Sequence, residues 1–152
     1  MATIDVAGGT SGHLPSSTGR KQAMVLERTV DFAKVTEKKG SDLASSDVVN
    51  VFNLPAGSYL LAGGAEVEEA ETNASATTVD VGTGGGDTIV DGADVTSTGF
   101  KASGTNGSRE LNTTGAFQAS DATVTMKIAS ATGVPANAKV RVYLLVADVN
   151  GR

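Results

Sequence analysis

Two runs of β-forming residues joined by a Pro-Ala-Gly turn constrain the fold of this chain more than any other feature. The runs are Val48–Leu54 and Ser58–Ala70. In the first run, apolar side chains occupy both alternating faces, which is typical of a strand inside a body of two packed sheets. Pro55 has no N–H to give to a ladder and Gly57 tolerates a positive φ, so we expect the chain to turn there and come back.

Alternation of apolar and polar residues continues along the rest of the chain, and no apolar stripe of helical period persists for ten residues. With 19 glycines to form tight turns, the pattern predicts an all-β chain of about seven to nine strands, an antiparallel β-sandwich or jelly roll. The predicted strands are, in chain order, Met24–Val35, Val48–Leu54, Ser58–Ala70, Thr77–Val81, Ala116–Ala119, Val124–Ile128 and Ala138–Val149.

Three connecting features complete this prediction. Gly63 and Gly64 mark a bulge or a bend inside the second run. Thr88–Val90 is either a short strand or a turn of helix. Residues 91–113 are expected to be mostly loop, with Phe100 as a single apolar anchor.

The length of 152 residues fits one domain with one core. Residues 1–22 are rich in Gly, Ser and Thr, and we expect them to form an extended N-terminal arm on a β-sandwich body of residues 23–152. An arm of this composition is rarely ordered unless something holds it, so we expect it to contact a neighbouring chain. The candidate interaction residues of the arm are His13, Leu14, Arg20 and Lys21.

The sequence argues against three features: cysteine-based sites, a membrane span and a signal peptide. The chain has no cysteine, so it forms no disulfide and no thiolate metal site. No apolar run approaches the ~20 residues that span a bilayer, so we expect no membrane partner. The first residues lack both the basic and the apolar region of a signal peptide, and we expect the protein to be cytoplasmic when it is made.

Negative charge is concentrated in the middle of the chain. Between Lys39 and Lys101 there is no Lys or Arg but there are ten carboxylates: Asp42, Asp47, Glu66, Glu68, Glu69, Glu71, Asp80, Asp87, Asp91 and Asp94. Such a block argues against nucleic-acid binding, which needs clustered Lys and Arg. Two interpretations stay open: a solvated face that keeps the protein soluble, or a face that meets a basic partner or points outward from an assembly.

Two features have the residue types of a catalytic or phosphate site but lack the required context. His13 is the single histidine, and a Gly/Ser-rich arm does not hold a general base rigidly. The glycine-rich segment 82–86 is followed neither by Gly-Lys-Ser/Thr nor by a helix that would donate amides. We therefore expect a surface histidine and a turn between strands.

Two groups of carboxylates suggest chemistry more weakly. Asp87, Asp91 and Asp94 are a candidate cluster for a hard cation such as Ca²⁺, but their spacing matches no EF-hand. Glu66 and Glu68 share one face of a strand, as a pair of glycosidase carboxylates would. Nothing around them supplies a pocket, and the chain has two Tyr and no Trp to stack on a sugar. We expect no enzyme activity, no cofactor, no metal and no small-molecule substrate.

Four segments, taken in order, resemble a group of small virion structural proteins of tailed bacteriophages, notably marine and cyanobacterial ones. In that group a β-run ends in Pro-Ala, a Val-x-Val/Ile-Gly step meets an Asp/Gly loop ending in VDGADV, and a valine-rich strand closes the chain. The segments are VFNLPAGSYLLAGGAEVEEAE (51–71), TTVDVGTGGGDTIVDGADV (77–95), GAFQASDATVTMKI (115–128) and AKVRVYLLVADVNG (138–151).

The resemblance covers about residues 23–151 and leaves the arm outside it. It implies a jelly-roll-like body and a capsid decoration (cement) protein on the virion surface, bound to the major capsid protein and commonly a homotrimer. It implies no functional residues, because the shared positions are structural. The alternative is the trimeric receptor- or glycan-binding head of a tail or head fibre, with the loops between Gly82 and Asn112 as its recognition tip. Either protein would be made in the host cytoplasm.

Overall fold

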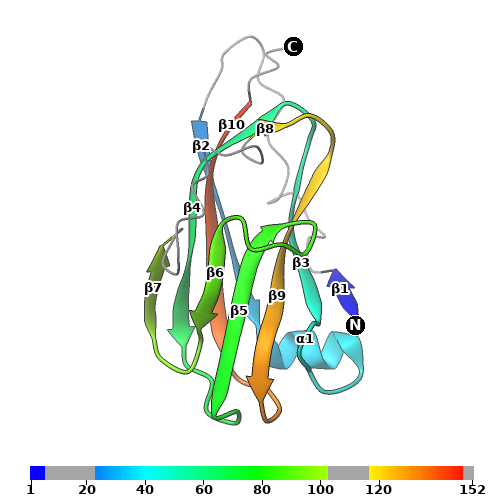
Figure 1. The fold of residues 1–152 in the computed structure, drawn as a ribbon, viewed down its shortest axis with the longest axis vertical. Coiled ribbons are helices and arrows are strands. Elements are labelled where there is room, and N and C mark those ends of the chain that lie inside the picture. Colours follow the sequence, from blue (N-terminus) through cyan, green and yellow to red (C-terminus); the bar gives the residue numbers. More distant parts are fainter. Residues whose placement is uncertain (6–22, 103–116, 149–152) are drawn as a thin grey trace.

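The computed structural model describes residues 1–5, 23–102 and 117–148, which form two facing β-sheets and one helix (Figure 1). Sheet A has the strand order β1 (Thr3–Asp5), β3 (Val48–Leu54), β9 (Ala122–Thr132), β5 (Ala76–Thr83) and β6 (Val90–Asp94). Sheet B has the order β2 (Ala23–Asp31), β10 (Lys139–Asp148), β4 (Ser58–Glu69) and β7 (Gly99–Ala102), and the short strand β8 (Phe117–Gln118) also pairs with β4.

A single aliphatic core fills the space between the two sheets. Strand β10 shows how alternation produces it, because Val140, Val142, Leu144 and Val146 are all fully buried. On β3 the alternation is broken by a register shift against β9, so that both Val51 and Phe52 reach the core. The all-β sandwich expected from the sequence is confirmed.

The chain crosses repeatedly from one sheet to the other. The turn at Pro55–Gly57 exists, and Gly57 has the positive φ that the sequence predicts, 86°. It does not make a hairpin, however: β3 lies in sheet A, whereas β4 lies in sheet B and pairs with β10. Within the described residues, β5 and β6 are the consecutive strands that pair directly with each other.

The predicted strand Met24–Val35 is wrong in its last part. Strand β2 ends at Asp31, and helix α1 (Phe32–Lys39) follows at one end of the sandwich. The side chain of Asp31 caps the helix by accepting a hydrogen bond from the Ala33 N–H, and Gly40 ends it in the left-handed conformation. The helix buries Phe32 and Val35 against the core.

The glycine pair in β4 allows close approach rather than a bulge. The register shifts of β4 against β10 fall elsewhere, beside Leu61 and Glu68. A Cβ on Gly63 would lie 2.7 Å from the Ile89 side chain, so a side chain there would collide with the core. The bulge predicted at Gly63 and Gly64 is therefore wrong in position.

The structure also contains more strands than predicted. Its described part holds ten, and the additional ones include β1 within the expected arm and β7 within the expected loop of residues 91–113. Strand β1 pairs in parallel with β3 of its own chain, with Thr3, Ile4 and Asp5 opposite Val48, Val49 and Asn50. The remainder of the arm lies outside the described residues, and the division at residue 22 stays a prediction.

Candidate interaction surfaces

The outward face of sheet B carries most of the exposed large apolar side chains in the described part of the chain. We call this the sheet B face. Val25 on β2 lies opposite Leu145 on β10, which lies opposite Ala62 on β4, next to Leu61. The exposed large apolar residues of sheet B are Val25 on β2 (66%), Leu61 on β4 (45%), Phe100 on β7 (59%) and Phe117 on β8 (46%). An apolar surface on neighbouring strands is typical of a site of protein contact.

Two aromatic pairs lie on the sheet B face. The ring of Phe100 stacks on Tyr143 with ring centroids 5.4 Å apart and planes inclined by 9°. It reaches Tyr143 across Gly64, where an added Cβ would lie 3.3 Å from the Phe100 ring. Tyr59 and Phe117 form the second pair, with centroids 6.5 Å apart. Phe100 was expected to be a single apolar anchor in a loop, but it lies in strand β7 and is an exposed surface residue.

Ion pairs cover the other end of the same face. The Arg141 guanidinium bonds Glu66 and lies 3.4 Å from Glu68, and Lys139 Nζ lies 2.7 Å from Glu69. The hydrogen bond to Glu66 and that carboxylate's charge raise the pKa of Arg141 above its ordinary value. The two carboxylates considered as a glycosidase pair thus share one arginine on an open sheet surface.

Glu71, next along the acidic segment, is buried and holds a loop in place. Its residue surface is 3% exposed. Oε1 accepts hydrogen bonds from the N–H groups of Asn73 and Ala74, at 2.7 and 3.3 Å. Oε2 accepts bonds from the loop before β10, at 2.9 to 3.3 Å, and its donors are Ala136, Asn137 and Ala138. Burial alone would raise the pKa of Glu71, but these backbone donors lower it below the ordinary value.

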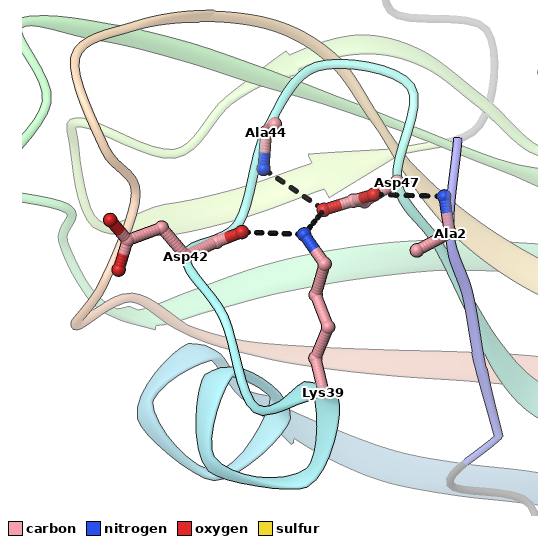
Figure 2. A network of polar contacts seen from close by, with 5 residues as sticks. All are labelled: Ala2, Lys39, Asp42, Ala44 and Asp47. Carbon is pink, nitrogen blue, oxygen red and sulfur yellow. Dashed lines mark hydrogen bonds and ion pairs between the residues drawn. The ribbon is translucent and has the colours of Figure 1, made fainter.

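A second buried acid, Asp47, holds the start of the chain (Figure 2). Its Oδ1 accepts a hydrogen bond from the Ala2 N–H at 3.1 Å, and its Oδ2 accepts bonds from Lys39 Nζ at 2.5 Å and from the Ala44 N–H at 3.0 Å. Burial would raise the pKa of Asp47, but Lys39 and the two N–H donors outweigh it and hold the pKa low. We call Ala2, Lys39, Asp42, Ala44 and Asp47 the clasp. Lys39 also donates to the Asp42 carbonyl.

Replacing Asp47 by alanine should lower the free energy of unfolding by about 2 kcal/mol, because the Lys39 ammonium and two N–H groups lose their partner. Amide hydrogen exchange should rise most at Val48, whose N–H donates to the Ala2 carbonyl at 2.8 Å. Asp42→Ala is the matched control, because its carboxylate points away from the clasp and its carbonyl is retained (Figure 2). Equal protection of Val48 in both variants would contradict the role of the clasp.

The acidic segment is therefore not one solvated face. Asp47 and Glu71 are buried, and three glutamates are paired with Lys139 and Arg141 from the last strand. Two further aspartates bind backbone N–H groups: Asp80 accepts from Gly92, and Asp94 accepts from Thr96. Many of the carboxylates of the acidic segment therefore bind cationic or N–H groups of the same chain, some buried and some on the surface.

The remaining candidates from the sequence are the residues of the arm and the aspartates proposed for a cation. His13, Leu14, Arg20 and Lys21 lie outside the described residues. Among the described residues, no group of three or more His, Cys, Asp or Glu is placed to hold a metal ion, and Asp87, Asp91 and Asp94 form no such group. No helix in that part of the chain is long and apolar enough to cross a membrane.

The glycine-rich segment after β5 is a closed turn. The N–H of Gly84 donates to the Thr123 carbonyl, and that of Gly85 donates to the Thr125 hydroxyl at 2.9 Å. The N–H of Gly86 donates to the Thr83 carbonyl. Because these amides are already bonded within the protein, the segment does not present them to a phosphate, in agreement with the turn expected from the sequence.

The comparisons with known proteins reveal a shared fold. No known family model matches the chain, and no curated protein matches it. A chain in the capsid of Ralstonia phage GP4 superposes with a TM-score of 0.66 and 17% identity, covering 97% of this chain and 98% of that one. A chain in the capsid asymmetric unit of cyanophage Pam1 gives 0.61 and 20%, covering 93% and 98%.

A third chain, from the acid-stable capsid of Helicobacter pylori bacteriophage KHP30, gives a TM-score of 0.50 and 16% identity over 84% of this chain and 93% of that chain. In the first two matches nearly all of both chains is covered, so these neighbours are close to this chain in length as well as in fold. At these identities the likeness establishes the fold.

Proposed function

We propose that this protein is a non-enzymatic virion structural protein that decorates the outer surface of a phage capsid as a cement protein. One observation carries the proposal: 97% and 93% of this chain are covered by the matches to chains of nearly equal length in two phage capsids, so the likeness extends over more than a single motif. The ordered motifs in the sequence favour the same group of proteins. The buried and ion-paired roles of its acidic residues suit a structural protein rather than an enzyme.

The proposed partner is the major capsid protein, and no nucleic acid, membrane, cofactor or small-molecule substrate takes part. A homotrimer would bind several capsid subunits at once. Because linked contacts raise avidity without a single strong site, modest contacts suffice to bridge neighbouring subunits and slow their separation. Light scattering of the purified protein should give three times the mass of one chain. A monomer at capsid-binding concentrations would overturn the trimer.

The sheet B face is the surface that we propose for contact with the capsid protein. It combines exposed apolar side chains on neighbouring strands with a charged margin at Lys139 and Arg141. An apolar centre with a polar rim is the usual anatomy of an interface between proteins that also exist separately. The face lies on the opposite side of sheet B from the core, so a partner that binds there leaves the core of the sandwich intact.

Leu61→Glu should weaken binding to capsids about tenfold, because a charge without a partner would be placed in the contact. The stability of the free protein should change by less than about 0.5 kcal/mol, since Leu61 is already 45% exposed. Val134→Glu is the matched control, at a residue that is 43% exposed but lies between β9 and β10. Binding is measured by co-sedimentation with capsids that lack the protein. Equal losses for both variants would remove the sheet B face as the contact.

Copy number separates decoration from the fibre alternative. A cement protein is present in amounts comparable to the shell protein, whereas a fibre head is present in far fewer copies. Densitometry of purified virions should therefore place this chain among the abundant proteins. Low copy number confined to tails would favour the fibre.

The arm of residues 1–22 is the element that we propose to reach a neighbouring chain. An extended segment pairs as an added strand, and its loss of conformational freedom is offset by many backbone hydrogen bonds. Deleting residues 1–20 would test this poorly, because Ile4 is buried in the core and β1 belongs to sheet A. A test that keeps β1 intact is therefore needed.

A further inference from the structure

We propose that strand β1 is exchanged between copies of this protein, so that residues 2–5 of one copy occupy the β3 edge of the next. This inference rests on the proposed function in one respect, since it names the partner of the arm as a second copy held nearby. The site itself is seen within one chain, where β1 fills the edge of β3 beside the clasp (Figure 2).

The β3 edge is built to receive a strand. Without β1, Asp47 Oδ1 would lose the Ala2 N–H, and the Val48 N–H would lose the Ala2 carbonyl. The core would also lose Ile4, which is 5% exposed. Lys39 neutralises Asp47 from within the body, so the incoming strand needs to supply no charge to Asp47. It contributes backbone groups and the apolar side chains of Ile4 and Ala2, which pack in and against the core. A second copy supplies the same groups.

Nothing in these contacts requires the strand to come from the same chain. Strand β1 lies in sheet A, and the next element, β2, lies at the edge of sheet B. The 17 residues 6–22 separate them. A segment of this length reaches at most about 60 Å, whereas a globule of this size has a radius of gyration of about 15 Å. The strand of one copy therefore reaches the β3 edge of an adjacent copy.

Concentration decides which copy supplies the strand. A linker of this kind gives a chain's own strand an effective concentration on the order of mM at the β3 edge, and copies fixed side by side in an assembly reach the same order. A chain's own β1 and the β1 of a neighbouring copy then compete for the β3 edge with similar free energies, because the exchanged strand makes the same contacts as the strand of the same chain. In this exchange, the strand of one copy binds the β3 edge of the next copy, so the two surfaces in contact are different. Such head-to-tail contacts can close into a ring of three copies.

The test uses two single-cysteine variants, because the natural chain has no cysteine. Thr3→Cys marks the strand and Val48→Cys marks the edge, at positions that are paired in the register. Neither variant forms a disulfide within one chain, so a bond between residues 3 and 48 reports exchange alone. Asn50→Cys is the second acceptor if Val48→Cys fails to fold, since Asn50 lines the same hollow as Thr3.

The variants are mixed, assembled on capsids or concentrated to about 1 mM in solution, oxidised, and analysed by mass spectrometry for the 3–48 linkage. Thr3→Cys mixed with Ser130→Cys is the control for random collision, because Ser130 is exposed on β9 of sheet A, away from the proposed capsid contact. We expect the 3–48 product at least tenfold above the control, and its loss when Asp47→Ala is added to the Val48→Cys chain.

A 3–48 yield equal to the control, in both settings, would overturn exchange, provided that the double variant Thr3→Cys/Val48→Cys closes within one chain. The capsid and solution settings separate this proposal from the proposed function. A protein that does not bind capsids but gives the 3–48 product in solution would contradict decoration and support exchange. A protein that binds capsids but gives no 3–48 product in either setting would support decoration and contradict exchange.

Discussion

Replacing Glu71 by glutamine should lower the free energy of unfolding by about 3 kcal/mol at neutral pH, measured by urea denaturation. The carboxylate accepts hydrogen bonds from five backbone N–H groups in a buried position. In the amide, the NH₂ group would face some of these donors, leaving buried N–H groups without an acceptor. Each such group costs about 1–3 kcal/mol, and bonds to a charged acceptor are the stronger ones.

The difference between wild type and Glu71→Gln should shrink in acid. The folded-state pKa of Glu71 lies below its ordinary value of 4.5. The ionised group therefore contributes its full stabilisation above about pH 4.5, and the contribution is lost as the pH falls from there through the folded-state pKa. Glu69→Gln is the control, because Glu69 is exposed and forms a surface ion pair with Lys139. A Glu71→Gln variant as stable as Glu69→Gln at pH 7 would contradict the role of Glu71.

Gly82→Ala should also destabilise the protein by about 3 kcal/mol, because the added methyl group meets backbone. A Cβ at this position would lie 2.6 Å from both the Gly86 carbonyl oxygen and the Thr88 nitrogen. Backbone atoms do not rotate away as the end of a flexible side chain does, so the β5–β6 turn would have to open. That opening would also break the hydrogen bond from the Thr125 hydroxyl to the Gly82 carbonyl.

Gly84→Ala is the control for this prediction. Gly84 has a φ of 63°, and an added Cβ would meet nothing within 4 Å. Its cost comes only from the left-handed backbone and should be about 1 kcal/mol. Thermal and urea unfolding of the two variants provide the comparison. Equal stability of the Gly82→Ala and Gly84→Ala variants would contradict the close packing inferred for the turn at Gly82.

Local alternation predicted most of the strands because it depends only on neighbouring residues. It placed β3, β4, β5 and β10 close to their observed bounds, and it found the centre of β9 but not its ends, since the strand spans Ala122–Thr132 rather than Val124–Ile128. It failed at α1 because Phe32 continues the parity of the buried residues of β2. The helix signals were present nonetheless: Asp31 is a preferred N-cap residue, and Gly40 is a preferred residue just beyond a helix C-terminus.

Features that depend on distant residues were not visible in the sequence. The donors to Glu71 Oε2 lie 65 to 67 residues further along the chain, so the sequence placed Glu71 only among the other acids of its segment. Similarly, the strands on either side of Pro55 belong to different sheets because of pairing with β9 and β10, which follow much later. The sheet B face required knowledge of which strands lie side by side.

The central proposal, that this protein decorates a phage capsid, is tested most directly by cryo-electron microscopy of virions purified from cells that express it. The account predicts density for the two-sheet body at symmetry-related positions on the outer surface, bridging neighbouring major capsid proteins, with the sheet B face toward the shell. A capsid surface that lacks this density, with the protein absent from the particle or restricted to the tail, would contradict it.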